Sequence, residues 1–301
     1  TLLPRSMKQL CKNSIWNFAD KSPAIRKFFE KCLESDSNLI YTLLPSQRDS
    51  ILEVLSNKKS VVLNMPTSSG KTLLAELYII YTLYIFREND ESIKPTVAYV
   101  APTNALVNQV RRELSQKFEG FGYRIETALP FYNMDEIEEE ILGSHVDILI
   151  TTPEKLDFLV RKNHSCIRNL KLVVMDEAHN IKYEERGSKF ELLLATIKQR
   201  KKDVNYLLLS PFIKNPKELA EWLGDSQNDS VSITINWSPT KQYVGCNLIK
   251  DNKTKSIVKY YPTPRNNILK DSVEIDLHVN PTEKKKELEC RRIDYKLRAA
   301  I

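Results

Sequence analysis

One segment, residues 60–86, constrains the fold of this chain more than any other. A short apolar run at residues 60–63 leads into a turn, Met-Pro-Thr-Ser-Ser-Gly-Lys-Thr at residues 65–72, and then into an apolar helical pattern that reaches residue 86. Triphosphate oxygens need several convergent N–H donors, and a loop that feeds a helix N-terminus presents them together with the positive end of the helix dipole. The segment therefore predicts a strand, a phosphate-binding loop and a helix.

The residue types in this turn divide the expected chemistry. Gly70 lets the backbone approach a phosphate, Lys71 can reach the β- and γ-phosphates, and the Thr72 hydroxyl can bind Mg²⁺. Met65 stands where the strict phosphate-loop pattern has glycine, and a turn of this composition before a helix is common, so the flanking strand and helix carry the prediction. The predicted ATP-binding residues of the turn are Thr67, Ser68, Ser69, Gly70, Lys71 and Thr72.

Compact apolar runs alternate with helical patterns from residue 44 onward. The predicted strands are residues 60–63, 96–100, 147–150, 172–175 and 206–209, and the predicted helices are residues 71–86, 105–118, 154–161 and 189–199. Short apolar strands without alternation are typical of a parallel sheet that is covered on both faces. We predict an α/β fold with a doubly wound, mostly parallel sheet, whose ligands bind at the carboxyl ends of the strands.

A second polar group, Asp176-Glu177-Ala178-His179, follows the predicted strand at residues 172–175. A carboxylate at a strand end can hold Mg²⁺, usually through water, while its neighbour accepts a proton from attacking water. By itself such a pair is also typical of a helix N-terminus, where the dipole favours negative charge. Its place in the same sheet as the phosphate loop favours the catalytic interpretation, with Asp176 on the metal and Glu177 as the base.

These segments together resemble the first RecA-like domain of a superfamily 2 DEAD/DEAH-box helicase, with residues 176–179 as motif II. Details of the further blocks resemble the Ski2-like branch, and the resemblance covers about residues 43–240. The other blocks that carry it are residues 101–109 (motif Ia), residues 146–157, Arg186-Gly187 with Glu191, residues 209–215 (motif III) and residues 219–224. The resemblance implies an ATP-dependent helicase or translocase motor that hydrolyses ATP and uses Mg²⁺.

The resemblance also implies roles for residues outside the phosphate loop and the acidic pair. Gln47 resembles the glutamine that reads adenine, and a carboxamide offers adenine both a donor and an acceptor. Motif III usually reads Ser-Ala-Thr, whereas this chain has Ser210-Pro211-Phe212 and lacks the second hydroxyl. We expect His179 and Ser210 to form a reduced link between motif II and motif III.

Two predicted turns are candidates for holding a nucleic-acid backbone. Pro102-Thr103 and Thr152-Pro153 each follow a strand and open a helix, so their hydroxyls and N–H groups can face an anion. Ordinary helix capping is the alternative, and the paired placement favours a phosphate track. Asn104 stands where a basic residue is common in motif Ia. The predicted nucleic-acid-binding residues are Pro102, Thr103, Asn104, Gln109, Thr152, Pro153 and Lys155.

The chain divides into three predicted segments. Residues 1–42 form short helices, residues 43–240 form the RecA-like ATP-binding domain, and residues 241–301 form a basic extension or the start of a connection to a second domain. This last segment carries fourteen Lys and Arg against eight Asp and Glu. Its net charge of 14 − 8 = +6 equals the formal net charge of the whole chain. It includes a predicted strand at residues 273–279 and a helix at residues 283–300. Since the resemblance implies a second RecA-like domain, we expect the chain to be a fragment that is poorly active alone.

Several partners follow from these predictions. We expect nucleic acid as a single strand or partial duplex, either RNA or DNA, and the second RecA-like domain; a protein partner on either terminal extension is a further candidate. The five cysteines include no CxxC pair and no signal peptide is recognisable, which favours a cytoplasmic or nuclear location. The longest apolar stretch, residues 73–86, is short for a bilayer and contains Glu76, so we expect no membrane.

Other functions stay open at this point. A nucleotide-gated nucleic-acid-binding scaffold or switch without unwinding is the alternative to a helicase, because of Pro211-Phe212 and the missing second domain. A small-molecule kinase with a phosphate loop would leave the turns at Thr103 and Thr152 unexplained.

Overall fold

The computed structural model describes residues 2–34, 39–56, 58–90, 92–128, 142–178, 184–235, 237, 245–249, 255–260 and 272–276. The chain forms two compact units, Thr1–Pro239 and Thr240–Ile301. The predicted helix at residues 283–300 lies outside the described residues.

The larger unit contains a seven-stranded sheet with the strand order β3-β4-β2-β5-β6-β1-β7. All neighbouring pairs are parallel. The strands are β1 (Ser60–Asn64), β2 (Thr96–Val100), β3 (Ile125–Ala128), β4 (Ile148–Thr151), β5 (Leu170–Met175), β6 (Asn205–Ser210) and β7 (Ser230–Thr234). Because the sheet is parallel, the residues after each strand meet at one edge, which is where ligands bind in such folds.

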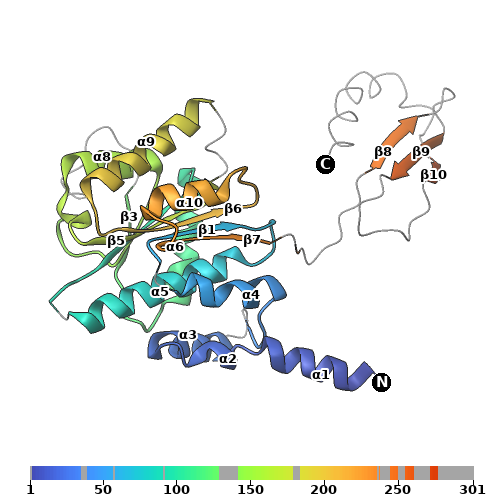
Figure 1. Ribbon diagram of the computed structural model, residues 1–301, viewed down its shortest axis with the longest axis horizontal. Helices are drawn as coiled ribbons and strands as arrows, with labels where there is room; N and C mark the ends of the chain where they lie inside the picture. Colours follow the sequence, from blue (N-terminus) through green and yellow to red (C-terminus); the bar gives the residue numbers. More distant parts are fainter. Residues whose placement is uncertain are drawn as a thin grey trace. The chain divides into compact units, whose positions relative to one another are not determined.

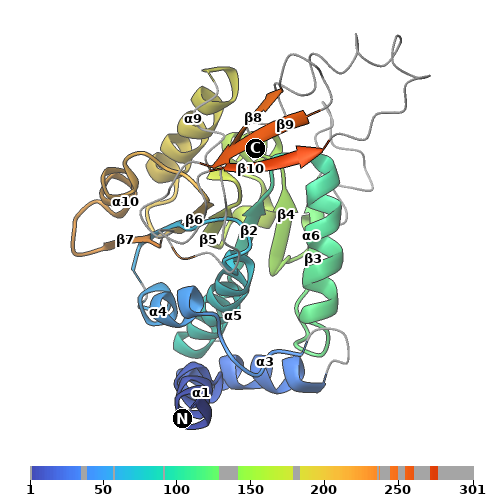
Figure 2. The same cartoon turned by 90° about the vertical axis from the view of Figure 1, so that its right-hand side faces the viewer.

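Helices cover both faces of this sheet. The views in Figures 1 and 2 agree on the stacking, with α9 and α10 on one side of the sheet and α4 and α5, then α3, on the other. The helices are α1 (Leu2–Asn13), α2 (Trp16–Ala19), α3 (Pro23–Glu34), α4 (Pro45–Val54), α5 (Lys71–Asn89), α6 (Asn104–Lys117), α8 (Pro153–Lys162), α9 (Glu184–Arg200) and α10 (Pro216–Gly224), and Ser165–Ile167 form a short 3₁₀ helix.

Two apolar clusters fill the space on either side of the sheet. Val61 and Leu63 pack with α3, α4 and α5 in one cluster, whereas Val62 belongs to the cluster formed with α8, α9 and α10. Successive strand side chains point to opposite faces, so a strand that is covered on both sides must be apolar at every position. This explains why the central strands show continuous apolar runs.

The predicted fold class is confirmed, and the five predicted strands are all present. The sequence did not predict β3 and β7, which lie at the two edges of the sheet. β3 reads Ile-Glu-Thr-Ala and β7 reads Ser-Val-Ser-Ile-Thr, and most of these side chains are half-buried. Edge strands carry polar residues because one side of them meets solvent, so the apolar run that marks a central strand is missing.

The N-terminal helices pack into the same unit as the sheet. The Ser22 hydroxyl accepts a hydrogen bond from the Ile25 N–H at 3.1 Å and caps α3, which presents Phe28 and Phe29 to the apolar cluster. The Leu43 N–H donates to the Asn13 carbonyl at 2.7 Å, so the chain returns alongside α1 before it enters α4. The predicted short helices before residue 42 are therefore confirmed.

The smaller unit contains a three-stranded antiparallel sheet with the order β10-β9-β8. Its strands are β8 (Gly245–Ile249), β9 (Lys255–Tyr260) and β10 (Ser272–Asp276). β10 corresponds to the strand predicted at residues 273–279, of which residues 277–279 lie outside the described part. Among the described residues, no helix is long and apolar enough to cross a membrane.

Candidate nucleotide-binding site

The phosphate loop and the acidic pair lie at the same edge of the sheet. The loop follows β1 and the pair follows β5, and these two parallel strands are separated by β6 alone. Burial lowers the pKa of Lys71, and the nearby carboxylates of Glu177 and Asp176 oppose this effect. The structure therefore brings together the two groups that the sequence predicted to face each other.

The loop has a conformation that depends on glycine. Gly70 has φ +85°, and a Cβ atom at this position would lie 2.0 Å from Nε2 of Gln47. The Ser69 hydroxyl donates to the Pro66 carbonyl at 2.5 Å, and Nζ of Lys71 donates to the Met65 carbonyl at 2.9 Å. Thr67, Ser68 and Thr72 are exposed in the loop that follows the carboxyl end of β1. The backbone is thus folded tightly around the position where Lys71 begins α5.

The start of α4 braces this loop from behind. Oε1 of Gln47 accepts a hydrogen bond from the Leu44 N–H at 2.8 Å, and its Nε2 donates to the Gly70 carbonyl at 3.2 Å. The Ser46 hydroxyl donates to the Ser69 carbonyl at 2.8 Å. A carboxamide has two N–H groups and two acceptor lone pairs on its oxygen. Gln47 therefore keeps hydrogen-bonding capacity for a base beyond the bonds that position it.

The acidic pair is held by the neighbouring strand β2. The Asp176 N–H donates to the Val100 carbonyl at 3.0 Å, and the Tyr99 hydroxyl donates to Oδ2 of Asp176 at 2.9 Å. Oδ1 of Asp176 accepts the N–H of Glu177 at 2.8 Å. Burial and the Asp176 carboxylate raise the pKa of Tyr99 well above its ordinary value, so the phenol keeps its proton. Glu177 has φ 52°, and the chain turns sharply between the two carboxylates.

The turn after β6 is tied to the start of the phosphate loop. The Met65 N–H donates to the Ser210 carbonyl at 2.9 Å, and Oδ1 of Asn64 accepts the Ile213 N–H at 3.1 Å. The buried Ser210 hydroxyl accepts the N–H of Phe212, at 3.1 Å. His179 lies outside the described residues, and so the link between His179 and Ser210 stays a prediction.

The two candidate phosphate turns lie side by side because β2 and β4 are neighbours. They differ in how their hydroxyls are used. Oγ1 of Thr103 accepts the Leu106 N–H at 3.4 Å and caps α6. Thr152 occupies the same position before α8, but its side chain makes no capping bond and its buried Oγ1 has no partner among the described residues.

The remaining predicted nucleic-acid contacts differ in exposure. Asn104 and Gln109 are exposed on α6, where Nε2 of Gln109 donates to Glu113 at 2.8 Å. Pro102 is half-buried and Pro153 is buried. The side chain of Lys155 is only 2% exposed, with Nζ 5.6 Å from the centre of the Phe158 ring. A contact between Lys155 and a strand of nucleic acid stays a prediction.

Comparison with known proteins identifies the family. The DEAD/DEAH box helicase family matches residues 44–219, which is more than half of the chain. The chain belongs to this family. The family's ATP-dependent DNA helicase Hel308 from Methanocaldococcus jannaschii is 34% identical over 203 residues, which cover 67% of this chain and 16% of that protein. Hel308 from Pyrococcus horikoshii is 32% identical over 221 residues, which cover 72% of this chain and 28% of that protein.

These relatives support the Ski2-like branch that the motifs resemble. The DUF1998 helicase MrfA, in its crystal structure bound to DNA, superposes with a TM-score of 0.53 and 22% identity over 69% of this chain and 29% of that chain. This likeness shows the fold. The chain spans less than a third of the length of each of these proteins.

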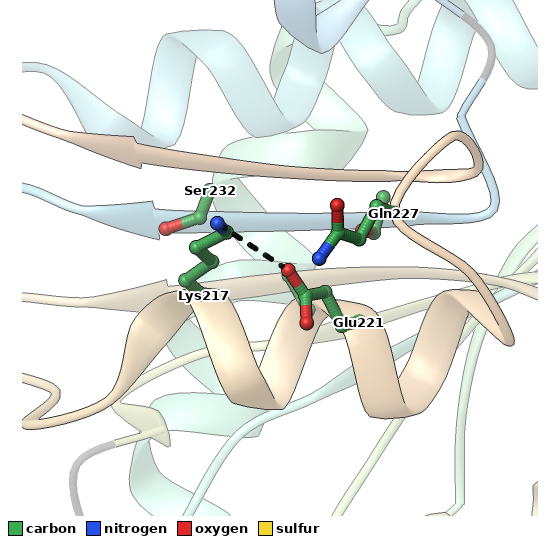
Figure 3. Close-up of a pocket in the computed structure, with 6 residues that line it drawn as sticks. Lys217, Glu221, Gln227 and Ser232 are labelled. Atoms are coloured by element: carbon green, nitrogen blue, oxygen red, sulfur yellow. Dashed lines mark ion pairs between the residues drawn. The ribbon is translucent and has the colours of Figure 1, made fainter.

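A further pocket lies between β7 and α10, the helix that contains the block at residues 219–224. It has a volume of about 310 Å³, and Lys217 and Glu221 form an ion pair at 3.7 Å on its wall (Figure 3). The pocket is lined by Lys217, Ala220, Glu221, Gln227, Ser230 and Ser232. It contains none of the residues predicted for ATP or nucleic acid.

Tyr99 and Asn64 are site residues that sequence reasoning missed. Each is a polar residue within or at the end of a strand that is otherwise apolar, at Thr-Val-Ala-Tyr-Val and Ser-Val-Val-Leu-Asn. A buried polar group needs a partner, so such a residue is a signal for a specific contact, although the sequence does not identify the partner.

Proposed function

We propose that this chain is the ATP-binding motor domain of a nucleic-acid helicase or translocase and that it corresponds to the first RecA-like domain. The observation that carries the proposal is the placement of Lys71 opposite Asp176 and Glu177 at the carboxyl edge of one parallel sheet. The relatives named ATP-dependent DNA helicases support the proposal that the chain binds both ATP and nucleic acid.

The residues present fit a magnesium-bound triphosphate. The loop has a close backbone approach at Gly70, a half-buried ammonium at Lys71, and an exposed hydroxyl at Thr72. Two carboxylates stand opposite one ammonium, which leaves negative charge for a divalent cation. In this proposal Thr67, Ser68 and Ser69 complete the loop around the phosphates.

Each site residue has a separate role in this proposal. Thr72 and Asp176 would hold Mg²⁺, partly through water, and Lys71 would bind phosphate oxygens. When bound, Mg-ATP supplies the phosphoryl group that is transferred to water. Glu177 accepts a proton from that water, and Gln47 offers its remaining N–H and lone pair to the adenine edge.

One strand of nucleic acid would lie along the turns before α6 and α8. Two adjacent helix N-termini present N–H groups and positive dipole ends to successive phosphates. Since these are contacts to the backbone, we expect binding to depend little on base sequence. The residues proposed for this track are Pro102, Thr103, Asn104, Gln109, Thr152, Pro153 and Lys155.

We propose three segments along the chain. Residues 1–42 form a helical segment, residues 43–240 the motor domain, and residues 241–301 a basic extension or connection. A second RecA-like domain would complete the ATP site with an arginine, and a protein partner would bind one of the extensions.

Two variants test the assignment of the catalytic roles. Lys71→Ala should abolish binding of a fluorescent ATP analogue, because the loop loses its cation. In the complete protein, Glu177→Gln should retain this binding and lose ATP turnover, because a carboxamide does not accept the proton. Turnover in Glu177→Gln equal to that of the wild type would refute the role of Glu177 as base.

An alternative function is a nucleotide-gated scaffold that binds nucleic acid without unwinding it. Phe212 favours this alternative, because it stands where the second motif III hydroxyl is usual and is 60% exposed. ATP-dependent binding without strand displacement would support the scaffold. Displacement of a labelled strand from a partial duplex by the full-length protein would exclude it.

A further inference from the structure

Tyr99 occupies an unusual position for a polar side chain. It lies on the central strand β2, is only 2% exposed, and packs within the apolar cluster beside α5. Its hydroxyl nevertheless donates to Oδ2 of Asp176, the residue directly after β5, at 2.9 Å. β2 is paired with β5, in a register that places Tyr99 opposite Val174, two residues before Asp176.

We propose that Tyr99 is a positioning residue for the carboxylate of Asp176. Oδ2 is held by Tyr99 and Oδ1 by the N–H of Glu177, so both oxygens are fixed and the plane of the carboxylate is set. Each oxygen has lone pairs beyond the one that is used. The inference rests on the proposed function, in which Asp176 holds the metal ion.

The backbone of Asp176 is held by the same strand. Its N–H donates to the carbonyl of Val100, which directly follows Tyr99 in β2. Main chain and side chain are therefore both attached to β2, and the carboxylate has little freedom to rotate away from the phosphate loop. Hydrogen bonds that orient a metal-binding side chain strongly affect metal affinity.

Two other buried tyrosines show what a merely structural hydroxyl does in this fold. The Tyr78 hydroxyl donates to the Lys58 carbonyl at 3.0 Å, away from the acidic pair. The buried Tyr206 hydroxyl has no partner among the described residues. Tyr99 differs from both because its partner is the proposed metal-binding residue. Tyr78 and Tyr206 are therefore matched controls.

The test is a Mg²⁺ titration of the binding of a fluorescent ATP analogue to the 301-residue chain. In Tyr99→Phe the ring still fills the core and only the hydroxyl is lost. We expect the Mg²⁺ concentration at half-saturation to rise about tenfold, with unchanged binding of the analogue when Mg²⁺ is removed by a chelator. Tyr78→Phe and Tyr206→Phe should titrate like the wild type.

The double variant Tyr99→Phe/Asp176→Asn provides a second measurement. If Tyr99 acts through Asp176, the double variant should be no worse than Asp176→Asn, because interacting residues are not additive. Additive losses would overturn the proposal. So would a Mg²⁺ titration of Tyr99→Phe that coincides with the wild type, or a Tyr99→Phe chain that does not fold.

Failure of the positioning role and failure of the proposed function give different results. In the first case the wild type still binds the analogue in a Mg²⁺-dependent way, and Lys71→Ala still loses it. In the second case the wild type shows no Mg²⁺-dependent binding, which overturns both proposals.

Discussion

Gly70 and Gln47 approach so closely that no side chain fits between them. A Cβ atom on Gly70 would lie 2.0 Å from Nε2 of Gln47, and the Gly70 carbonyl accepts the hydrogen bond from the same nitrogen. The phosphate loop is thereby seated directly on the first turn of α4. This contact makes the shape of the loop dependent on a residue 23 positions earlier in the chain.

Gly70→Ala should therefore destabilise the chain and abolish nucleotide binding. A residue other than glycine at positive φ costs about 1–2 kcal/mol, and the methyl group also displaces Gln47. Gly120→Ala is a matched control, because Gly120 has φ +79° but nothing within 4 Å of its Cβ position. Urea unfolding of both variants measures the difference. Equal losses of stability would show that the contact with Gln47 is unimportant.

Lys71→Met should stabilise the ligand-free chain at pH 7 while it removes nucleotide binding. Burial lowers the pKa of Lys71 below 10.5, so its charge is unfavourable in the folded chain. Between the lowered pKa and 10.5 the folded chain binds fewer protons than the unfolded chain, and stability rises with pH. The advantage of Lys71→Met in thermal unfolding should thus shrink as the pH rises toward 10.5. An advantage that grows over this range would contradict the prediction.

Glu76 should make stability fall as the pH rises from mildly acid to neutral. Burial raises its pKa above 4.5, although the ion pair with Lys117 at 2.6 Å opposes this effect. Above 4.5 and up to the raised pKa, the folded chain binds more protons than the unfolded chain, so ionisation costs stability. Glu76→Gln removes this component, and its urea midpoint relative to the wild type should be higher at pH 8 than at pH 5.

Glu30→Gln, on α3, is the control for that pH series. The Glu30 side chain is 53% exposed and pairs with Arg26 at 3.7 Å. Such pairs at the surface contribute little, so this variant should follow the wild type across the series. Parallel pH profiles of the wild type and Glu76→Gln would show that Glu76 is not the responsible group.

Thr103→Ala and Thr152→Ala should affect stability differently and strand binding alike. Thr103 caps α6, so its loss costs about 0.5–1 kcal/mol, whereas Thr152 makes no capping bond and its replacement should be close to neutral. If both hydroxyls bind phosphates, each variant should weaken single-strand binding about threefold to tenfold. Fluorescence anisotropy with a labelled strand measures this. Wild-type affinity in both variants would show that neither hydroxyl binds a phosphate, and capping of α6 would remain as the role of Thr103 alone.

The central strands were predictable because they are covered on both faces. A run such as Leu172 to Met175 is apolar at every position, and such a run has few other places in a folded chain. β3 and β7 were not predictable in this way, because half-exposed edge strands contain Glu126, Ser230 and Ser232 among their residues.

The contacts that hold the site together were harder to predict. Tyr99 and Asp176 are separated by 77 residues, and Asn64 and Ile213 by 149. The sequence marks Tyr99, Asp176 and Asn64 as polar residues near strand ends, whereas Ile213 contributes only its backbone N–H. It contains no information on which pairs meet.

Short stretches of sequence were sufficient to identify the phosphate loop and the acidic pair, because the chemistry of each depends on neighbouring residues and on the strand that precedes them. The same stretches identified the family. The distance between those groups is a different matter. It depends on the strand order β5-β6-β1, which places two tips from distant parts of the chain beside each other. Likewise, packing decides that Thr103 caps its helix while Thr152 does not, since hydrogen bonding depends on angles that residue type alone leaves open.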